Sequence, residues 1–153
     1  MKIIDVQQQT VQGISVRTKN SDEMNPKTGK IGGLWGNFSK SFGPHMSNDD
    51  QVYGVYCAYE SDHNGEFNVL AGMKNVSDEA QKSLAEPLET VTLEAGRYAV
   101  FSGTGAMPQE VVEVWQEIWQ HFNAPDCPHK RQYKTDFEHY TSRESVDIYI
   151  GIA

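Results

Sequence analysis

Apolar residues recur at helical spacing in two segments about 80 residues apart. In residues 31–42 (IGGLWGNFSKSF) they stand three or four positions apart, which predicts an amphipathic helix. Residues 109–122 (QEVVEVWQEIWQHF) have the same period, with glutamates on the opposite side. Pro108 suits the first turn of this second helix, because a helix start needs no N–H there. The pattern therefore predicts two helices.

Runs of aromatic and β-branched residues between turn signals predict strands. The predicted strand segments are Gln12–Thr18, 52–60, 66–75, Glu89–Gly103 with a turn at Gly96, Gln132–Tyr140 and Val146–Ile152. Residues 62–65 (DHNG) form a turn signal, so 52–60 and 66–75 are expected to pair as a hairpin. The last two segments are expected to form a closing hairpin.

The two parts of the chain repeat this order, about 1–76 and 88–153, and each reads strand–helix–strand–strand. Laid over each other, Trp35 falls on Trp115 and Cys57 falls on Glu138. A period of this length is too long for a solenoid and indicates a duplicated half-domain, with Ser77–Pro87 as the connector. We therefore expect one α+β domain over residues 1–153: an antiparallel sheet with two helices on one face, related by a pseudo-twofold axis.

The strand at residues 132–142 (QYKTDFEHYTS) carries a carboxylate among aromatic residues. Side chains alternate along a strand, so Asp136, Glu138 and Tyr140 are expected on one face. Tyr133, Thr135 and Phe137 are expected on the other face. Glu138 lies either on a solvated face or in an aromatic pocket, where a charge is costly unless it is paired.

A buried carboxylate beside aromatic rings is a binding site for a bulky organic cation. A cation over an aromatic face gains about 0.5–2 kcal/mol, and a desolvated carboxylate attracts it more strongly than an exposed one does. The candidate ligand-binding residues are Glu138, Tyr140, Trp35, Phe38, Trp115 and Trp119. The aromatic stripes can equally be plain helix–sheet core, and residue spacing does not decide between the two interpretations.

Composition excludes several partners. The net charge of −8 and the absence of a basic stripe argue against direct nucleic-acid binding. No apolar run is long enough for a bilayer span, and the N-terminus lacks a signal-peptide core, so we expect a cytoplasmic protein. Residues 102–108 (SGTGAMP) lack the P-loop lysine and are expected to be an ordinary turn.

Metal and nucleophile signals are weak. Cys127 and His129 do not have the spacing of a zinc site, and no second ligand pair follows, so a surface loop without metal is expected. The five histidines are scattered, and no nucleophile elbow is present. Glu138 with Tyr140 could serve as general base and acid, so hydrolysis stays open, and no cofactor is predicted.

The Phe137-Glu138-x-Tyr140 strand, residues 98–105 (YAVFSGTG) before a tryptophan-bearing helix, and the duplicated layout resemble the GyrI-like family. That family includes the effector-binding domains of AraC- and MerR-type multidrug-responsive regulators, and the chain is particularly similar to stand-alone cationic-drug-binding proteins of integron cassettes. The resemblance implies an aromatic cleft between the two halves and a carboxylate, here Glu138, that binds lipophilic cationic small molecules.

The same resemblance implies two alternatives. Some relatives are hydrolases that use a glutamate, and others bind DNA gyrase. The candidate surface for a separate protein partner is the acidic helix face of Glu110, Glu113 and Glu117, although a solvated face is the commoner explanation. Because no helix-turn-helix segment is visible, a role in transcription is expected to need a separate DNA-binding partner.

Overall fold

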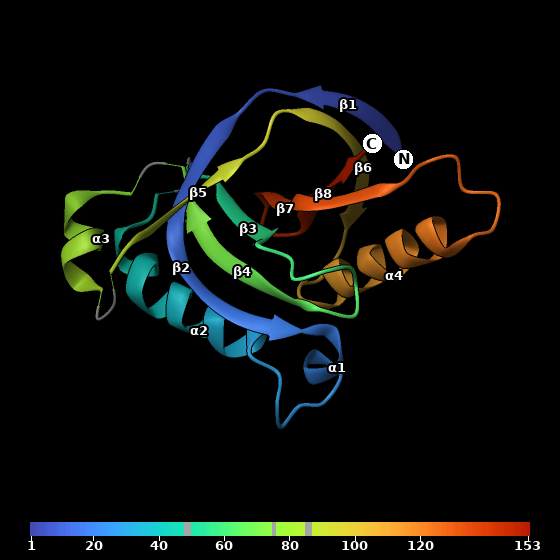
Figure 1. The fold of residues 1–153 in the computed structure, drawn as a ribbon. Helices are drawn as coiled ribbons and strands as arrows, with labels where there is room; N and C mark the ends of the chain where they lie inside the picture. Colours follow the sequence, from blue (N-terminus) through green and yellow to red (C-terminus); the bar gives the residue numbers. More distant parts are fainter. Residues whose placement is uncertain (48–49, 75, 85–86) are drawn as a thin grey trace.

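The structure is a computed structural model that describes residues 1–47, 50–74, 76–84 and 87–153. Within these residues, eight strands form one antiparallel sheet in the order β1-β6-β8-β7-β3-β4-β2-β5 (Figure 1). The strands are β1 Lys2–Val6, β2 Gln9–Lys19, β3 Val52–Cys57, β4 Glu66–Met73, β5 Glu89–Leu93, β6 Gly96–Thr104, β7 Arg131–Ser142 and β8 Ser145–Ile152. The helices are α1 Asn20–Glu23, α2 Ile31–Phe42, α3 Asp78–Ser83 and α4 Gln109–Asn123, with a 3-10 turn, η1, at Gly43–His45.

The predicted α+β class, the antiparallel sheet and the two long helices on one face are confirmed. The predicted helix segments match α2 and α4 closely, and the two hairpins are the pairs β3–β4 and β7–β8. Leu34, Phe38 and Phe42 of α2 are buried against one face of β4. Val114 and Ile118 of α4 are buried against β6 and β8. Apolar periodicity therefore identified the buried side of each helix.

The strand order is symmetric about its centre, where β3 pairs with β7. The first strand of each part of the chain crosses to the other part: β1 pairs with β6, and β5 pairs with β2. The sequence pattern does not predict β1, which is a five-residue edge strand with mostly exposed side chains. It also does not predict the short helix α3, which lies in the expected connector and is capped by the Ser77 hydroxyl accepting the Ala80 N–H.

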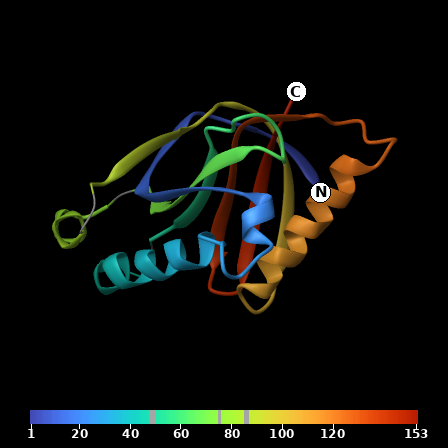
Figure 2. The same cartoon turned by 60° about the horizontal axis from the view of Figure 1, so that its bottom comes forward.

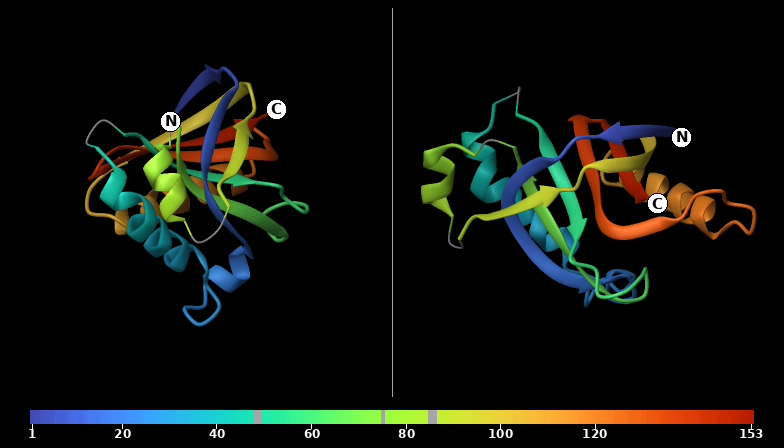
Figure 3. Two further views of the ribbon diagram at one scale, coloured as in Figure 1. Left: turned by 90° about the vertical axis from the view of Figure 1, so that its left-hand side faces the viewer. Right: turned by 45° about the horizontal axis from the view of Figure 1, so that its top comes forward.

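The sheet is strongly curled, as Figure 3 shows from two further sides. Its inner face gathers one apolar cluster from all eight strands, which includes Val11, Val55, Leu93, Phe137 and Tyr149. The outer face carries α2 and α4, each over its own part of the sheet. The paired strands β3 and β7 lie between the two helices, so their outward side chains are left for a site.

Among the described residues, no helix is both long and apolar enough to cross a membrane.

Candidate ligand-binding cleft

A cleft of about 1130 Å³ lies on the outer face, lined by residues of α2, α4, β3 and β7. Figure 2 shows the two helices on either side of the strands. Sites for drug-sized ligands measure about 300–1,000 Å³, so the cleft can hold a bulky molecule. All six residues predicted from the sequence line it: Glu138, Tyr140, Trp35, Phe38, Trp115 and Trp119.

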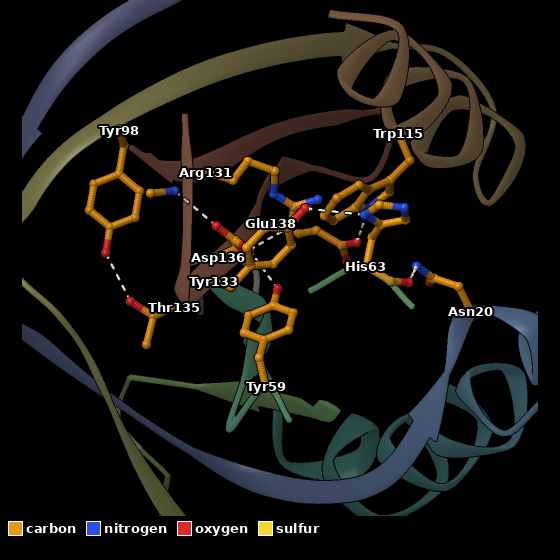
Figure 4. Close-up of polar contacts among 11 residues, drawn as sticks. Asn20, Tyr59, His63, Tyr98, Trp115, Arg131, Tyr133, Thr135, Asp136 and Glu138 are labelled. Carbon is orange, nitrogen blue, oxygen red and sulfur yellow. Dashed lines mark hydrogen bonds and ion pairs between the residues drawn. The ribbon is translucent and has the colours of Figure 1, made fainter. Parts of the chain in front are cut away.

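Glu138 forms the floor of this cleft and is almost fully buried, with 2% of its surface exposed. The Trp115 indole N–H and the Tyr56 hydroxyl both donate to its Oε2, each at 2.7 Å. The Tyr140 hydroxyl donates to Oε1 at 2.8 Å. Figure 4 shows the Trp115 contact, which ties α4 to β7. Three neutral donors therefore hold the carboxylate in place.

Burial and these hydrogen bonds act in opposite directions on Glu138. Removal from water raises the pKa of the carboxyl group, and the donors Trp115, Tyr56 and Tyr140 partly offset that rise. Burial, with Glu138 beside it, raises the pKa of the Tyr56 phenol well above its usual value. The pKa of Tyr140 is raised for the same reasons. Both phenols therefore stay protonated and remain donors.

Aromatic rings surround the carboxylate. Tyr140 contacts Trp35 edge-on, with ring centroids 5.4 Å apart. Tyr56 meets Trp115 in the same way at 5.0 Å. These pairs come from β7 with α2 and from β3 with α4, so each pair ties one helix to a central strand. Such edge-to-face contacts stabilise by about 0.5–1.5 kcal/mol beyond their buried area.

The two other predicted aromatic residues occupy different depths. Phe38 is buried and stacks on Phe42 at 4.7 Å, so most of its ring belongs to the core under α2. Trp119 is 36% exposed and lies 6.2 Å from Trp115, at the rim of the cleft. Trp35 and Trp115 are half-buried. The inner walls next to Glu138 are therefore Trp35 and Trp115.

A second buried carboxylate, Asp136, lies two residues before Glu138. Arg131 donates to its Oδ2 at 2.8 Å in an ion pair, and the Tyr59 hydroxyl donates to the same oxygen at 2.5 Å (Figure 4). The Gly151 N–H donates to Oδ1 at 2.8 Å. Burial lowers the pKa of Arg131, but the Asp136 charge outweighs it and the net pKa is raised. The negative charge of Asp136 is thus balanced by the positive charge of Arg131 within the protein.

Two details of the sequence analysis are wrong. The overlay placed Cys57 at the position of Glu138, but β3 places Gly54 opposite Glu138. Cys57 lies an odd number of residues from Gly54 and packs against the inner-face cluster. Short repeats fix the order of elements but not their register, and a one-residue error changes the face.

The predicted face of Tyr133 is also wrong. The pairing of β7 is irregular between Arg131 and Asp136, and Tyr133 has a positive φ of 54°. Its ring contacts Tyr59 and lies under the Arg131 guanidinium, and both of these residues bind Asp136. The irregular backbone therefore breaks the alternation on which the prediction relied.

Tyr56 and Gly54 are parts of the site that the sequence did not predict, because no local pattern predicts that β3 pairs with β7. Gly54 leaves the space that the Glu138 carboxylate occupies. A Cβ at Gly54 would lie 2.6 Å from Oε1 of Glu138 and 3.0 Å from Cζ2 of Trp35. Glycine at this position is therefore a requirement of the site rather than of the backbone.

Gly54→Ala is expected to displace Glu138 and Trp35. Overpacking of this kind costs about 1–3 kcal/mol of unfolding free energy, measured by urea denaturation. Gly36→Ala on α2 is the matched control, because a Cβ there meets nothing within 4 Å. That control should be neutral or raise stability by up to about 1 kcal/mol. Equal effects at both positions would contradict the close packing of Glu138 against Gly54.

Of the segment 102–108, which was expected to be a turn, residues 105–108 form the turn before α4 and residues 102–104 are the end of β6. Glu110 covers this segment, since a Cβ at Gly103 or Gly105 would lie 2.5 or 2.8 Å from its carboxylate oxygens. A carboxylate in this position repels phosphate. Glu113 and Glu117 are exposed on the outer side of α4, whereas Glu110 is half-buried. Cys127 and His129 lie on the loop that was expected, and the fold brings one further possible ligand, His121, next to them.

A curled antiparallel sheet with two helices flanking one cleft is the architecture of an effector-binding domain. The family profile of the Cass2 integron-associated effector-binding proteins matches residues 2–152, and the chain belongs to this family. An integron cassette protein from the mobile metagenome of Vibrio cholerae has the same fold at 42% identity. It has a TM-score of 0.90 and covers 99% of this chain and 95% of its own.

Two more distant structures share the fold. The protein SAV2435, bound to tetraphenylphosphonium, is 17% identical with a TM-score of 0.70, over 99% of this chain and 93% of its own. A putative transcription regulation protein from Staphylococcus aureus MU50 is 16% identical with a TM-score of 0.71, over 99% and 96%. None of the curated protein sequences compared with the chain matches it.

Proposed function

We propose that the cleft binds amphipathic organic cations, with Glu138 as the counter-charge and Trp35, Trp115 and Tyr140 as its aromatic walls. Phe38 supports the wall of α2, and Trp119 covers a ligand at the rim. In this role the chain acts as a cytoplasmic sensor or sequestering protein for drug-like cations. With a net charge of −8, it works without direct contact to nucleic acid.

The observation that carries this proposal is the contrast between the two buried carboxylates of β7. Asp136 has Arg131 as a cationic partner. Within the described part of the chain, the partners of Glu138 are three neutral donors and no ion pair reaches it. A buried carboxylate without a counter-charge is costly, and a cationic ligand over it removes that cost. Glu138 is therefore positioned as an acceptor for a charge from outside the protein.

The walls favour a lipophilic cation over a small inorganic one. Hard metal ions need several oxygen ligands, whereas Glu138 is surrounded by rings and its oxygens already accept three hydrogen bonds. Flat rings bind the apolar body of an organic cation and attract its charge through their faces. The tetraphenylphosphonium complex of a protein with the same fold supports this class of ligand.

The direct test is a fluorescence titration with two ions of nearly equal shape and opposite charge, tetraphenylphosphonium and tetraphenylborate. Trp115 donates to Glu138 and Trp35 lies beside Tyr140, so a ligand at the carboxylate should quench tryptophan emission. We expect saturable quenching by the phosphonium and none by the borate. Equal quenching by both ions, or quenching by the cation that does not saturate, would contradict the proposal that Glu138 acts as a counter-charge.

Cation binding should weaken as the pH falls. Burial raises the pKa of Glu138, so the carboxyl group is protonated, and neutral, at a higher pH than an exposed glutamate would be. Affinity for tetraphenylphosphonium should therefore fall with decreasing pH, and the fall should begin at a higher pH than it would for an exposed glutamate. Titrations between pH 7.5 and about 4.5 measure this, and a flat profile would contradict the role of the ionised carboxylate.

The hydrolase alternative is less well supported by the geometry. Trp115, Tyr56 and Tyr140 donate hydrogen bonds to both carboxylate oxygens of Glu138, which leaves these oxygens less available to a substrate proton, and the family is one of effector-binding proteins. The alternative that a protein partner binds the acidic face of α4 is supported by the exposure of Glu113 and Glu117 alone.

A further inference from the structure

The end of α4 and the connector that follows it bring together three side chains that bind transition metals. His121 lies in the last turn of α4, and Cys127 and His129 lie on the connector to β7. One ligand atom from each residue lies within 4.8 Å of the other two, and all three side chains are half-buried. Nε2 of His121 and Nδ1 of His129 are 3.4 Å apart. The residues that line the cleft do not include these three.

We propose that His121, Cys127 and His129 form a binding site for a zinc-type transition-metal ion. One thiolate and two imidazoles are ligands that Zn²⁺ and similar ions prefer over the oxygen ligands of Mg²⁺ and Ca²⁺. A tetrahedral zinc ion with bonds of about 2.0–2.3 Å holds its ligand atoms roughly 3.3–3.8 Å apart. The two histidine nitrogens already have that spacing, and Cys127 needs only a small shift to complete it.

Contacts within the local structure fix the positions of these residues. The His121 ring packs edge-on against Phe101 at 5.4 Å and Phe122 at 4.9 Å, which fixes its orientation. The Cys127 N–H donates to the Ala124 carbonyl in a tight turn, and the Cys127 thiol donates to the His129 carbonyl at 3.3 Å. Pro125 and Pro128 restrict the backbone on both sides of this turn.

Three protein ligands leave a fourth position, which water or an outside ligand fills. Binding displaces the thiol proton of Cys127 and requires neutral imidazoles, so it weakens in acid. The metal would also clamp the connector between α4 and β7, which projects from the body of the molecule (Figure 1). It would therefore stabilise the folded state.

Titration of the full chain with Co²⁺ under reducing conditions tests the proposal. A tetrahedral site with one thiolate gives intense visible ligand-field bands and a sulfur-to-cobalt charge-transfer band in the near ultraviolet. We expect both in the wild type, saturating at one Co²⁺ per chain and displaced by Zn²⁺. Cys57→Ser is the matched control, because it removes the other free thiol and should leave the bands intact.

Cys127→Ser should abolish the charge-transfer band, and His129→Ala should lower Co²⁺ affinity at least tenfold. Thermal unfolding gives a second readout: Zn²⁺ should raise Tm in the wild type and in Cys57→Ser, and leave Cys127→Ser unchanged. An equal Tm of the three proteins in EDTA shows that the variants fold. Absent bands in the wild type, or bands that persist in Cys127→Ser, would overturn the proposal.

Discussion

Replacing Glu138 with glutamine is expected to lower the affinity for tetraphenylphosphonium at least about 30-fold. Removing one partner of a desolvated charge pair costs about 2–5 kcal/mol, and about 1.4 kcal/mol is a tenfold change in Kd. Glutamine has the shape of Glu138 and keeps an oxygen that can accept from Trp115 and Tyr56. The substitution therefore removes the charge and leaves the shape of the cleft. Quenching titrations of both proteins at pH 7 measure the change.

Two controls separate charge from packing. Glu113→Gln makes the same chemical change on the exposed side of α4 and should leave Kd within about twofold, because charges exposed to water are weakly coupled. A neutral ligand of similar shape, triphenylphosphine oxide, should bind the wild type and Glu138→Gln nearly equally. If both ligands lost affinity to the same extent in Glu138→Gln, the cleft would have been distorted and the counter-charge role would be refuted.

Replacing Arg131 with methionine is expected to destabilise the protein by about 3–5 kcal/mol, the usual cost of leaving one charge of a buried pair alone. Asp136 is fully buried, and the side chain of Arg131 is 8% exposed. Without the guanidinium, the Asp136 carboxylate keeps the neutral Tyr59 hydroxyl and Gly151 N–H as donors. Urea denaturation at pH 7 measures the loss of unfolding free energy.

The double variant Arg131→Met/Asp136→Asn should recover much of this stability, because it removes the remaining charge as well. Arg17→Met is the matched control. Arg17 lies 3.9 Å from Glu66 with about half of each side chain exposed, so its loss should cost about 1 kcal/mol or less. A loss in Arg131→Met no larger than in Arg17→Met would show that the Asp136 pair is not a buried one.

These two predictions concern neighbouring carboxylates that the sequence does not distinguish. Asp136 and Glu138 are two residues apart and share a face, as alternation predicted. What separates them is a cation: Arg131 reaches Asp136 across an irregular stretch of β7, and its chain does not reach Glu138. Local patterns carry no information on that irregularity, so both the partner of Asp136 and the side of Tyr133 come from the tertiary structure.

The positions of the two long helices could be predicted from the sequence alone. Ile31–Phe42 and Gln109–Asn123 were identified because an apolar stripe of period 3.6 is a local consequence of packing on a sheet. The central hairpins were identified because their turns and alternation are also local. By contrast, β1 pairs with β6 about ninety residues later, and β5 returns to β2. The short exposed β1 segment carries no sign of a partner at that distance.

The sequence by itself determined the α+β class, the duplicated order of elements, the two amphipathic helices and the presence of a carboxylate among aromatic residues. Each of these is encoded within a few neighbouring residues. Only the tertiary structure decided that β3 and β7 pair at the centre, that Gly54 leaves room for Glu138 and that Tyr56 binds it. The tertiary structure also decided that His121 reaches Cys127 and His129. These contacts join residues that are distant in the chain or lie across a turn, and their geometry depends on register and backbone irregularities that no local pattern encodes.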